Sequence, residues 1–364
     1  MAVQVSAQRP RTGLARRAID QTLLRHLAIA LVAGLALYAL TLALDPFNNL
    51  QLATMGYYFV AIAGLTVLTG QNGQISLGHG ALMAIGAYAM VKFQAALNWP
   101  LAPLLALSAI ATALAGVLVG AAAARLRGPY LAGATLALAV GLPALADRFS
   151  GFLGGSNGLL APPPTPPLSL GETFPLERWQ AWITCLAALV AFVLLANLMR
   201  SGYGRAFRAV RDDEVAAQLA GYHVARVQIV AFVFSAAAAG LAGGLLVVVS
   251  SLAAPGAFPL ALSVGLLTGV VLGGLGSLAG AVWGAAALVL VPTWADDASK
   301  AFSLSNNVQA NLALAIYGVV LIVVMLAAPY GIQGALRRAG RALVGGTWEQ
   351  RRRGAAPRQE EESP

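Results

Sequence analysis

The decisive stretch is Gly70-Gln71-Asn72-Gly73-Gln74-Ile75-Ser76-Leu77-Gly78-His79-Gly80, which interrupts an apolar run over 53–91 that contains no Asp, Glu, Lys or Arg. About 20 helical residues cross the hydrocarbon layer of a membrane, so this run is too long for one crossing. A second long run, 262–293, is interrupted at Gly273-Gly274-Leu275-Gly276-Ser277. The sequence therefore predicts two places at which a membrane-embedded chain leaves its helix.

Other charge-free runs of about 18 residues or more continue along the chain. They cover 27–44, 101–124, 129–146, 179–199, 228–250 and 309–328. Together with the two divided runs they give about ten membrane segments. We therefore predict an all-α integral membrane protein that includes broken or re-entrant helices.

The composition indicates the same class of protein. Of the 364 residues, 59% are hydrophobic and only 10% are charged, and the mean hydropathy is +0.75. A soluble domain carries about 25% charged residues, so this composition excludes an ordinary cytosolic enzyme, a coiled coil and a disordered chain. The 40 glycines are typical of membrane helices that pack backbone against backbone.

The positions of the basic residues predict the orientation in a lipid bilayer. If the N-terminus lies in the cytoplasm and each segment crosses, 19 of the 23 Lys and Arg residues fall on the cytoplasmic side. This bias follows the positive-inside rule and predicts that both termini are cytoplasmic. It also accounts for the net charge of +9 without a nucleic-acid partner.

This topology divides the chain into three predicted parts. They are a cytoplasmic segment 1–26, a polytopic membrane domain 27–328 and a basic cytoplasmic tail 329–364, which we expect to be mobile. The membrane domain includes an external loop over 147–178 and a cytoplasmic loop over 200–227. The first apolar run could instead be a secretory signal, but its preceding basic region is long, so we expect an uncleaved first span.

The sequence lacks the residues that several kinds of binding site and catalytic site require. The three histidines are scattered and no His-Glu-x-x-His occurs, so we expect no metal site. No Asp or Glu lies within the predicted spans, which disfavours an ion-coupled carrier. No Gly-Lys pair is present to form a P-loop, so we expect this chain to bind no cofactor, and ATP and Mg would have to be used by other subunits.

Four stretches carry a resemblance to a known family. In chain order they are Gly73-Gln74-Ile75-Ser76-Leu77-Gly78-His79-Gly80-Ala81 with Gly86-Ala87-Tyr88; Gly154-Gly155-Ser156-Asn157-Gly158-Leu159; Gly204-Arg205-Ala206-Phe207-Arg208-Ala209-Val210-Arg211-Asp212-Asp213-Glu214; and Gly273-Gly274-Leu275-Gly276-Ser277-Leu278-Ala279-Gly280. Their order and spacing resemble the permease subunits of ABC importers for branched-chain amino acids, specifically the LivM type. The resemblance covers about residues 50 to 330.

The resemblance implies partners and a location. A LivM-type permease would form a heterodimer with a LivH-like permease subunit in the bacterial inner membrane. Two cytoplasmic ABC ATPase subunits would hydrolyse ATP, and a periplasmic binding protein would deliver the substrate. The chain itself would be a transport subunit and not an enzyme.

The cytoplasmic loop is the candidate element for coupling to the ATPases. Its acidic residues suit the N-terminus of a short helix, a glycine would end that helix, and arginines recur every three residues along one basic flank. The candidate coupling residues are Gly204, Arg205, Arg208, Arg211, Asp212, Asp213, Glu214, Ala216, Ala217 and Gly221. The loop also resembles the Glu-Ala-Ala-x-x-x-Gly loop of importer permeases, with one residue inserted after the Glu and without the downstream Ile-x-Leu-Pro. A solvated loop that only fixes topology is the alternative.

The first glycine-rich break is the candidate border of the substrate path. Irregular backbone at membrane depth is tolerated only where protein covers it or where it lines an aqueous cavity. The candidate path residues are Gln71, Asn72, Gln74, Ser76, Gly78, His79 and Gly80. A structural hydrogen-bonding role for His79 is the preferred interpretation over direct contact with the substrate.

Glycines of the second break are candidates for helix interruption and close helix packing. They are Gly273, Gly274, Gly276, Gly280 and Gly284, the last three of which repeat at four-residue spacing. Such spacing presents a smooth face to a neighbouring helix. We expect packing to be their main role.

The predicted function is translocation of branched-chain, hydrophobic amino acids by an ATP-driven importer. Urea or short amides are alternative substrates, because no charged pocket for an amino acid is visible in the sequence. An ATP-independent channel or secondary carrier is the competing class of transporter. An intramembrane enzyme would need a catalytic dyad, and the sequence shows none.

Overall fold

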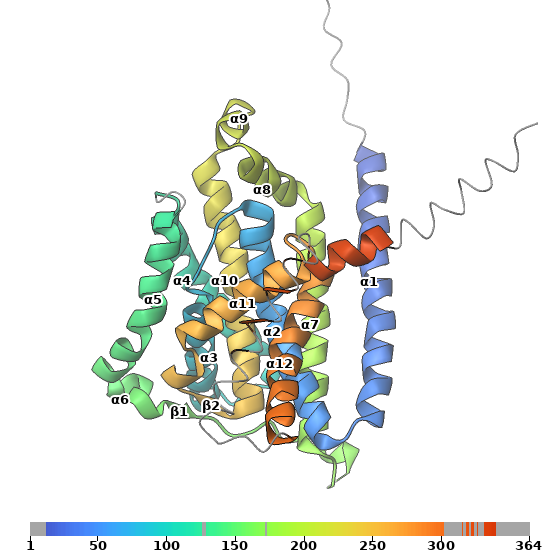
Figure 1. The fold of residues 1–364 in the computed structure, drawn as a ribbon, viewed down its shortest axis with the longest axis vertical. Coiled ribbons are helices and arrows are strands. Elements are labelled where there is room, and N and C mark those ends of the chain that lie inside the picture. The colour runs from blue at the N-terminus through green and yellow to red at the C-terminus, as the bar shows by residue number, and fades with distance from the viewer. Residues whose placement is uncertain are drawn as a thin grey trace, which may run out of the picture.

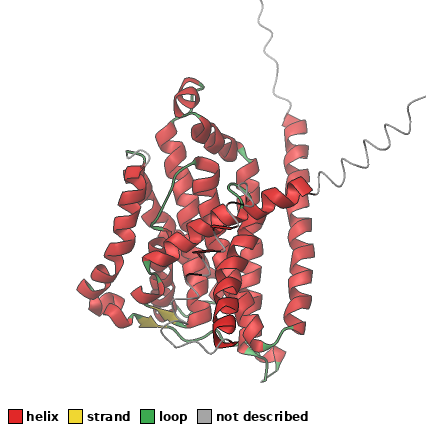
Figure 2. Cartoon of the chain, in the orientation of Figure 1, coloured by secondary structure: helices red, strands yellow, loops and turns green. Residues whose placement is uncertain are grey.

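The computed structural model describes residues 12–125, 129–171, 173–301 and 331–339, together with the single positions 315, 318, 319, 322, 323 and 326. Most of the predicted segment 309–328 and the tail beyond residue 339 lie outside the described residues, as does the start of the N-terminal segment. Figure 1 shows a bundle of long helices, and Figure 2 shows that helix is almost the only regular structure in it.

The helices follow one another with short connections, except on the side that carries the two strands. In chain order the elements are α1 (Thr12–Ala43), α2 (Pro46–Leu65), η1 (Thr66–Gln71), α3 (His79–Ala96), α4 (Leu101–Ala123), α5 (Pro129–Arg148), α6 (Ser150–Leu153), η2 (Gly155–Asn157), β1 (Leu159–Leu160), η3 (Leu168–Leu170), α7 (Leu176–Arg200), α8 (Gly202–Asp212), α9 (Glu214–Leu219), α10 (Val224–Ser250), β2 (Leu252–Ala253), η4 (Pro255–Ala257), α11 (Leu260–Gly273) and α12 (Leu278–Ala301).

Eight helices among the described residues are long and apolar enough to cross a membrane. The eight lie on α1, α2 with η1, α4, α5, α7, α10, η4 with α11, and α12. The shorter α3 and the predicted segment 309–328 bring the count close to the expected ten. The prediction of an all-α membrane protein with about ten segments is therefore confirmed, whereas the orientation of the termini stays a prediction.

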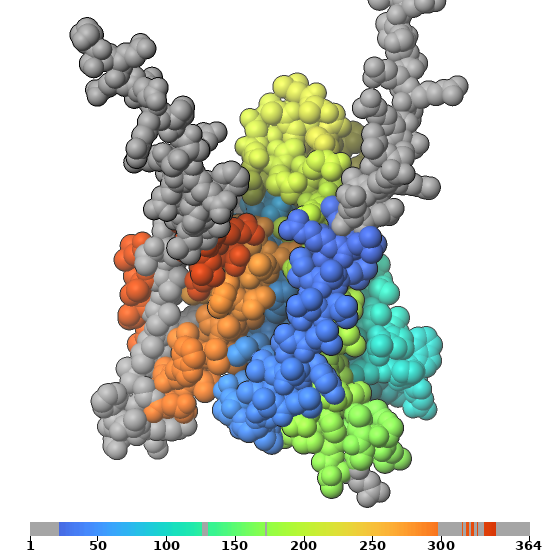
Figure 3. All heavy atoms as spheres, turned by 90° about the vertical axis from the view of Figure 1, so that its right-hand side faces the viewer, coloured from blue at the N-terminus to red at the C-terminus, as the bar shows by residue number. Residues whose placement is uncertain are grey.

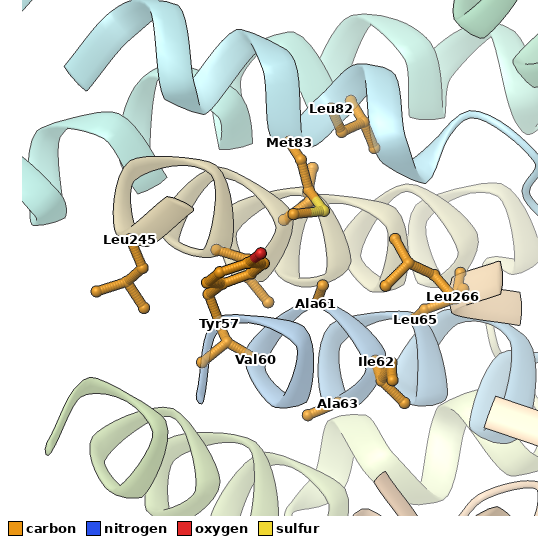
Figure 4. Packing of buried hydrophobic residues seen from close by; sticks show 14 of the residues in the cluster. Tyr57, Val60, Ala61, Ile62, Ala63, Leu65, Leu82, Met83, Leu245 and Leu266 are labelled. Carbon is orange, nitrogen blue, oxygen red and sulfur yellow. The ribbon is translucent and has the colours of Figure 1, made fainter. Parts of the chain in front are cut away.

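Two helices form the centre of the bundle. The central helices α2 and α10 pack against each other, and α10 also packs along α3 and α4. Figure 4 shows the apolar contact between them, with Tyr57, Ala61 and Leu65 of α2 facing Leu82 and Met83 of α3 and Leu245 of α10. Small residues allow this approach, since a Cβ added at Gly86 would collide with the backbone of Gly240.

The outer helix α1 lies at the edge of the bundle and packs mainly against α7. Apolar side chains such as Leu31, Val32 and Leu35 are exposed on it. Large exposed apolar surface on a long helix is typical of contact with lipid or with another membrane subunit. The sequence placed the start of this span at residue 27, whereas the helix begins fifteen residues earlier, at Thr12.

A short pair of strands joins two connections at the end of the bundle opposite α9 (Figure 1). Strand β1, in the predicted external loop 147–178, pairs antiparallel with β2 through Leu159 opposite Ala253 and Leu160 opposite Leu252. The predicted loop is therefore anchored near its start and contains short helical turns. Two-residue strands have no periodicity that sequence patterning could detect.

Candidate transport and coupling site

The first break begins with a change of helix type. The end of α2 continues as a π-helix, η1, whose wider turn carries the chain to Gln71. Gly73 then adopts a φ of 76°, a region that side chains other than glycine rarely adopt. The hydroxyl of Thr69 donates to the carbonyl oxygen of Gln74 over 2.9 Å, which closes the turn. The predicted interruption between 70 and 80 is present.

The start of α3 is held by side chains from two other helices. The backbone N–H of Leu77 donates to Oγ1 of Thr135 on α5, over 3.0 Å. The N–H of Gly80 donates to Oγ of Ser263 on α11, also over 3.0 Å. The first N–H groups of a helix have no partner within that helix, and water is absent from the core of a membrane. Thr135 and Ser263 therefore let α3 begin inside the protein.

Sequence analysis did not select Thr135 or Ser263. Thr135 is the one Ser or Thr of α5, and Ser263 shares the otherwise apolar α11 with Thr268. Their isolation is a weak signal, because hydroxyl side chains in membrane helices commonly bond to their own backbone. Thr135 does both, since its hydroxyl also donates to the carbonyl oxygen of Leu131 over 3.1 Å.

His79 is fully buried at the first position of α3. Its Nε2 lies 3.0 Å from the carbonyl oxygen of Ala61 on α2. A carbonyl oxygen only accepts, so Nε2 carries the proton and donates. Nδ1 has no hydrogen-bond partner among the described residues. The observed bond supports the structural role expected for this histidine.

The second break meets the first one. Nε2 of Gln71 donates to the carbonyl oxygen of Gly276 over 2.8 Å. The backbones are also close, because a Cβ added at Gly70 would collide with the backbone nitrogen of Gly276. Gly276 itself has a φ of 81°. The two glycine-rich stretches that the sequence singled out thus form one structural unit.

Two arginines of α8 bind this unit. Nη1 of Arg208 donates to Oε1 of Gln71 over 3.0 Å and to the carbonyl oxygen of Met199 over 3.1 Å. Nη1 of Arg211 donates to the carbonyl oxygen of Gly70 over 2.8 Å. We call the set Gly70, Gln71, Arg208, Arg211 and Gly276 the break junction. It connects α8, η1 and the turn between α11 and α12.

The three arginines that recur every three residues on the cytoplasmic loop make different contacts. Arg208 and Arg211 donate to groups of the break junction, although the Arg211 side chain is still 38% exposed, whereas the exposed Arg205 makes no such bond. Its closest bond, from Nη1 to the carbonyl oxygen of Arg200, is long at 3.5 Å. A helix turns by about 100° per residue, so positions six residues apart lie about 120° apart and cannot share a narrow face.

The short helix predicted after the acidic residues is present as α9. Oδ1 of Asp213 accepts from the N–H groups of Val215 and Ala216, at 2.8 and 3.0 Å. This is the N-terminal cap that the sequence indicated. Gly221 follows the helix with a φ of 89°. The helical end at this position was also predicted correctly.

The remaining coupling candidates divide into inner and outer groups. Gly204 lies against the carbonyl of Met199, and Ala217 is buried in a small cluster with Val210. Oε1 of Glu214 accepts from Nε2 of Gln228 over 2.9 Å. Asp212 forms an ion pair with its neighbour Arg211, with 2.8 Å between Nη2 and Oδ1. Ala216 is exposed on α9.

The outer face of α9 is apolar as well as exposed. Val215 and Leu219 have relative exposures of 66% and 86%. Helices α8 and α9 form the tip of the bundle (Figure 1), so these two exposed residues belong to that tip. An exposed apolar face on a short capped helix is typical of a surface that binds another protein. The geometry of this tip thus suits a docking element.

The other candidate path residues are enclosed by the chain. Asn72, Gln74, Ser76 and His79 are all buried, and they do not line the cavities of about 630 and 520 Å³. Neither the side-chain amide of Asn72 nor Oε1 of Gln74 has a described hydrogen-bond partner. Gly78 and Gly80 pack against Thr135 and Ser263. A substrate could reach these groups only after the segment moves.

Glycines of the second break bring α11 and α12 into backbone contact. Gly273 lies against Gly280, and a Cβ added at either would collide with the backbone of the other. A Cβ added at Gly284 would likewise collide with the backbone of Gly269. Gly274 is in close contact with Gly331. The close approach predicted for these glycines is therefore present.

Comparison with known proteins gives one consistent result. Residues 47–325 match the family model described as the permease component of the branched-chain amino acid transport system. LivM, a high-affinity branched-chain amino acid transport system permease protein of Salmonella typhimurium, is 32% identical over 266 residues, 67% of this chain and 62% of its own length. LivM of Escherichia coli is 33% identical over 269 residues, with the same coverage.

The LivH permease proteins are also similar. LivH of Salmonella typhimurium is 30% identical over 305 residues, which cover 79% of this chain and 94% of the relative. The match to each LivM relative spans less than two thirds of that relative. No solved structure matches the chain.

Proposed function

Because the chain belongs to the family of branched-chain amino acid transport permeases and is a multi-pass inner-membrane protein, we propose that it is the permease subunit of an ATP-driven importer. The observation that carries this proposal is the break junction. It ties an exposed, capped tip outside the membrane body to two interruptions within it. Such a connection is what a permease driven by an external motor requires.

The proposed partners follow from the relatives and from the tip. The matches include both LivM and LivH proteins, so a LivH-like permease would complete a heterodimer. Two cytoplasmic ATPase subunits would bind ATP and Mg, and one of them would dock on α8 and α9. A periplasmic binding protein would bring the substrate to the opposite end of the bundle. The chain itself then binds no cofactor and performs no hydrolysis.

Motion would pass from the tip to the breaks through hydrogen bonds. Arg208 and Arg211 contact Gln71 and the carbonyl of Gly70, and Gln71 contacts Gly276. Hydrogen bonds of a charged guanidinium are about twice as strong as neutral ones, so a shift of α8 would move η1 and the α11–α12 turn together. The first break would open as α3 and η1 separate, exposing Asn72, Gln74 and His79 to the path.

The proposed substrate is a branched-chain amino acid. An importer with a binding protein selects its substrate outside the membrane, so the path needs only to admit it. The buried amides of Asn72 and Gln74 would offer neutral hydrogen-bonding groups, while the surrounding core is apolar. Urea and short amides are the alternative, since neutral donors and acceptors also suit an amide.

The proposed orientation places the tip in the cytoplasm and the strand pair outside. Single cysteines at Leu219 on α9 and Leu168 on η3 test it, because both side chains are more than 80% exposed and the native Cys185 is buried. In sealed right-side-out vesicles, an impermeant maleimide should label the Leu168→Cys protein and leave Leu219→Cys unlabelled. If only the Leu219→Cys protein were labelled, the orientation in the membrane would be opposite to the proposed one.

Reconstitution tests the function itself. The chain would be co-expressed with a LivH-like permease, the ATPase subunits and a binding protein from the same organism, and the purified complex would be placed in liposomes. We expect uptake of radiolabelled leucine that requires ATP and the binding protein, with little uptake of urea. A complex whose ATPase lacks its P-loop lysine is the matched control. Uptake that continues in this control would favour a channel or a secondary carrier.

A further inference from the structure

A basic cavity of about 630 Å³ lies on the side of the bundle that carries α8 and α9. It is enclosed by α1, α7, α8, the start of α12 and the helical segment 331–339. Five of its lining residues are arginines, namely Arg25, Arg200, Arg205, Arg208 and Arg337. Figure 3 shows this face of the molecule, where α1 in blue lies next to segment 331–339 in red.

The arginines of the cavity lack a counter-charge within the described part of the chain. No Asp or Glu lines the cavity, and none of the five arginines forms an ion pair with a described carboxylate. Arg208 donates to neutral oxygens of Gln71 and Met199, and Arg337 donates to the hydroxyl of Ser277 over a long 3.4 Å. Like charges gathered in one concavity repel each other and attract an anion.

An apolar groove of about 520 Å³ continues from the basic cavity. The two share Ile29, Phe192 and Ala279, so that the groove begins where the cavity ends. Its lining comes from α1, α2, α7 and α12 and contains no charged residue. Along α1 it extends from Ile29 to Leu40, which is about 16 Å of helix and close to half of the ~30 Å hydrocarbon layer.

We propose that the cavity and the groove together bind one anionic phospholipid, with its phosphate among the arginines and an acyl chain between α1 and α12. The order of the two parts matches a lipid whose head lies on the α8 side, because the charged part is at the start of the Thr22–Ala43 span and the apolar part leads from it through the centre of that span. Basic pockets between membrane helices bind anionic headgroups by the same electrostatics. This lipid site does not depend on the proposed transport function.

The apolar groove distinguishes a lipid from other anions. A soluble phosphate compound would use the arginines but would leave the groove empty. An acidic segment of a partner protein would pair with the exposed arginines but would not require a long apolar channel. Only a molecule with an anionic head and a hydrocarbon chain uses both parts.

Native mass spectrometry of the full chain, purified in detergent with its co-expressed partners, tests the proposal. The complex would be titrated with phosphatidylglycerol, phosphatidylcholine and, as the soluble headgroup, glycerol phosphate. We expect one phosphatidylglycerol per chain to bind at least about tenfold more tightly than phosphatidylcholine. Glycerol phosphate should not displace it at equal concentration.

Two variants separate the head and chain parts of the site. The double variant Arg25→Gln/Arg337→Gln should weaken phosphatidylglycerol binding about tenfold or more, and Ala36→Phe, in the groove, should do the same by filling it. Matched controls are Arg125→Gln and Ala134→Phe, which change an exposed arginine on α4's end and an exposed alanine on α5 that line neither cavity. Both controls should bind the lipid as the unmodified chain does.

Several results would overturn the proposal. Equal losses in the controls would mean that the lipid binds without a defined site. If glycerol phosphate displaced phosphatidylglycerol at equal concentration, the cavity would be a pocket for soluble anions. Unchanged phosphatidylglycerol binding by Ala36→Phe would lead to the same conclusion. A complex that retains no phosphatidylglycerol, while the chain freed from its partners does, would show that a partner protein occupies the cavity. Thermal unfolding of each variant confirms that it is folded before its lipid binding is compared.

Discussion

The two glycine-rich breaks both hold non-helical backbone inside the bundle, but different kinds of contact stabilise them. The first is fixed by directional hydrogen bonds: its backbone N–H groups donate to the hydroxyls of Thr135 and Ser263, and one of its carbonyl oxygens accepts from Arg211. The second is held mainly by backbone against backbone, with Gly273 on Gly280 and Gly274 on Gly331. A hydrogen bond can break and reform with little change in volume, whereas a close backbone contact tolerates no added atom. We infer that α11 and α12 stay packed together as one unit during transport, whereas the hydrogen bonds at the first break can rearrange.

The largest expected effect is at the second break. In Gly280→Ala the new Cβ would collide with the carbonyl of Gly273, and two helix backbones would have to separate. Overpacking of this kind costs about 1–3 kcal/mol and sometimes more, so we expect most of the assembled protein to be lost. Fluorescence-detected size-exclusion chromatography measures assembly.

Gly141→Ala is the matched control for this substitution, because nothing lies within 4 Å of the position where its Cβ would be. It should assemble normally. If both variants assemble equally well, the second break is not a close-packed element.

The next effect concerns the junction between the breaks. Arg208→Gln and Arg211→Gln each remove a charged donor, and hydrogen bonds to charged groups contribute about 1.5–3 kcal/mol. In the reconstituted importer we expect leucine uptake per ATP hydrolysed to fall about tenfold or more, with the complex still assembled. The ratio of the two rates is the measurement.

Arg125→Gln provides the comparison, since it removes an exposed arginine at the end of α4 that has no contact with the junction. Its ratio of uptake to hydrolysis should equal that of the unmodified importer. A normal ratio in the junction variants would mean that motion reaches the membrane by another route.

A smaller effect is expected at the start of α3. Ser263→Ala and Thr135→Val each leave a buried N–H without its partner, at a cost of about 1–3 kcal/mol. Each should lower the unfolding temperature by several degrees. Thr66→Val is the control, because the hydroxyl of the buried Thr66 donates to the carbonyl of Ile62 one turn earlier in the chain and no described bond links it to another helix. If all three variants lowered the unfolding temperature equally, the bonds between helices would stabilise the protein no more than a hydroxyl bonded within its own helix.

The smallest effect is expected at His79. In His79→Asn one bond to the carbonyl of Ala61 is weakened, worth about 1 kcal/mol. Uptake should stay within about twofold, with the same pH profile. Gly78→Val, whose Cβ would lie 2.5 Å from the carbonyl oxygen of Thr135, should be far more damaging. If His79→Asn lost uptake while Gly78→Val transported normally, the segment would act through the histidine side chain and not through its glycine-rich backbone.

The sequence allowed prediction of features that depend on nearby residues. Apolar length predicted the spans, glycine and polar clusters predicted both breaks, and the acidic residues 212–214 predicted the start of α9. The direction of Arg208 and Arg211 could not be predicted, because it depends on which elements lie beside α8. The same holds for Thr135 and Ser263, whose partners are 58 and 183 residues away in the chain. The roles of the path and coupling residues stay predictions.

These sequence separations bear on how the protein is made. Gln71 bonds to Gly276, 205 residues later, and ribosomes add about 5–20 residues per second. The first break is therefore synthesised about 10–40 s before Gly276, the residue whose carbonyl oxygen accepts the hydrogen bond from Gln71. During that interval its polar groups need water, the insertion machinery or a chaperone as temporary partners. Slowed translation between α3 and α11 should thus expose the nascent chain to quality-control proteases.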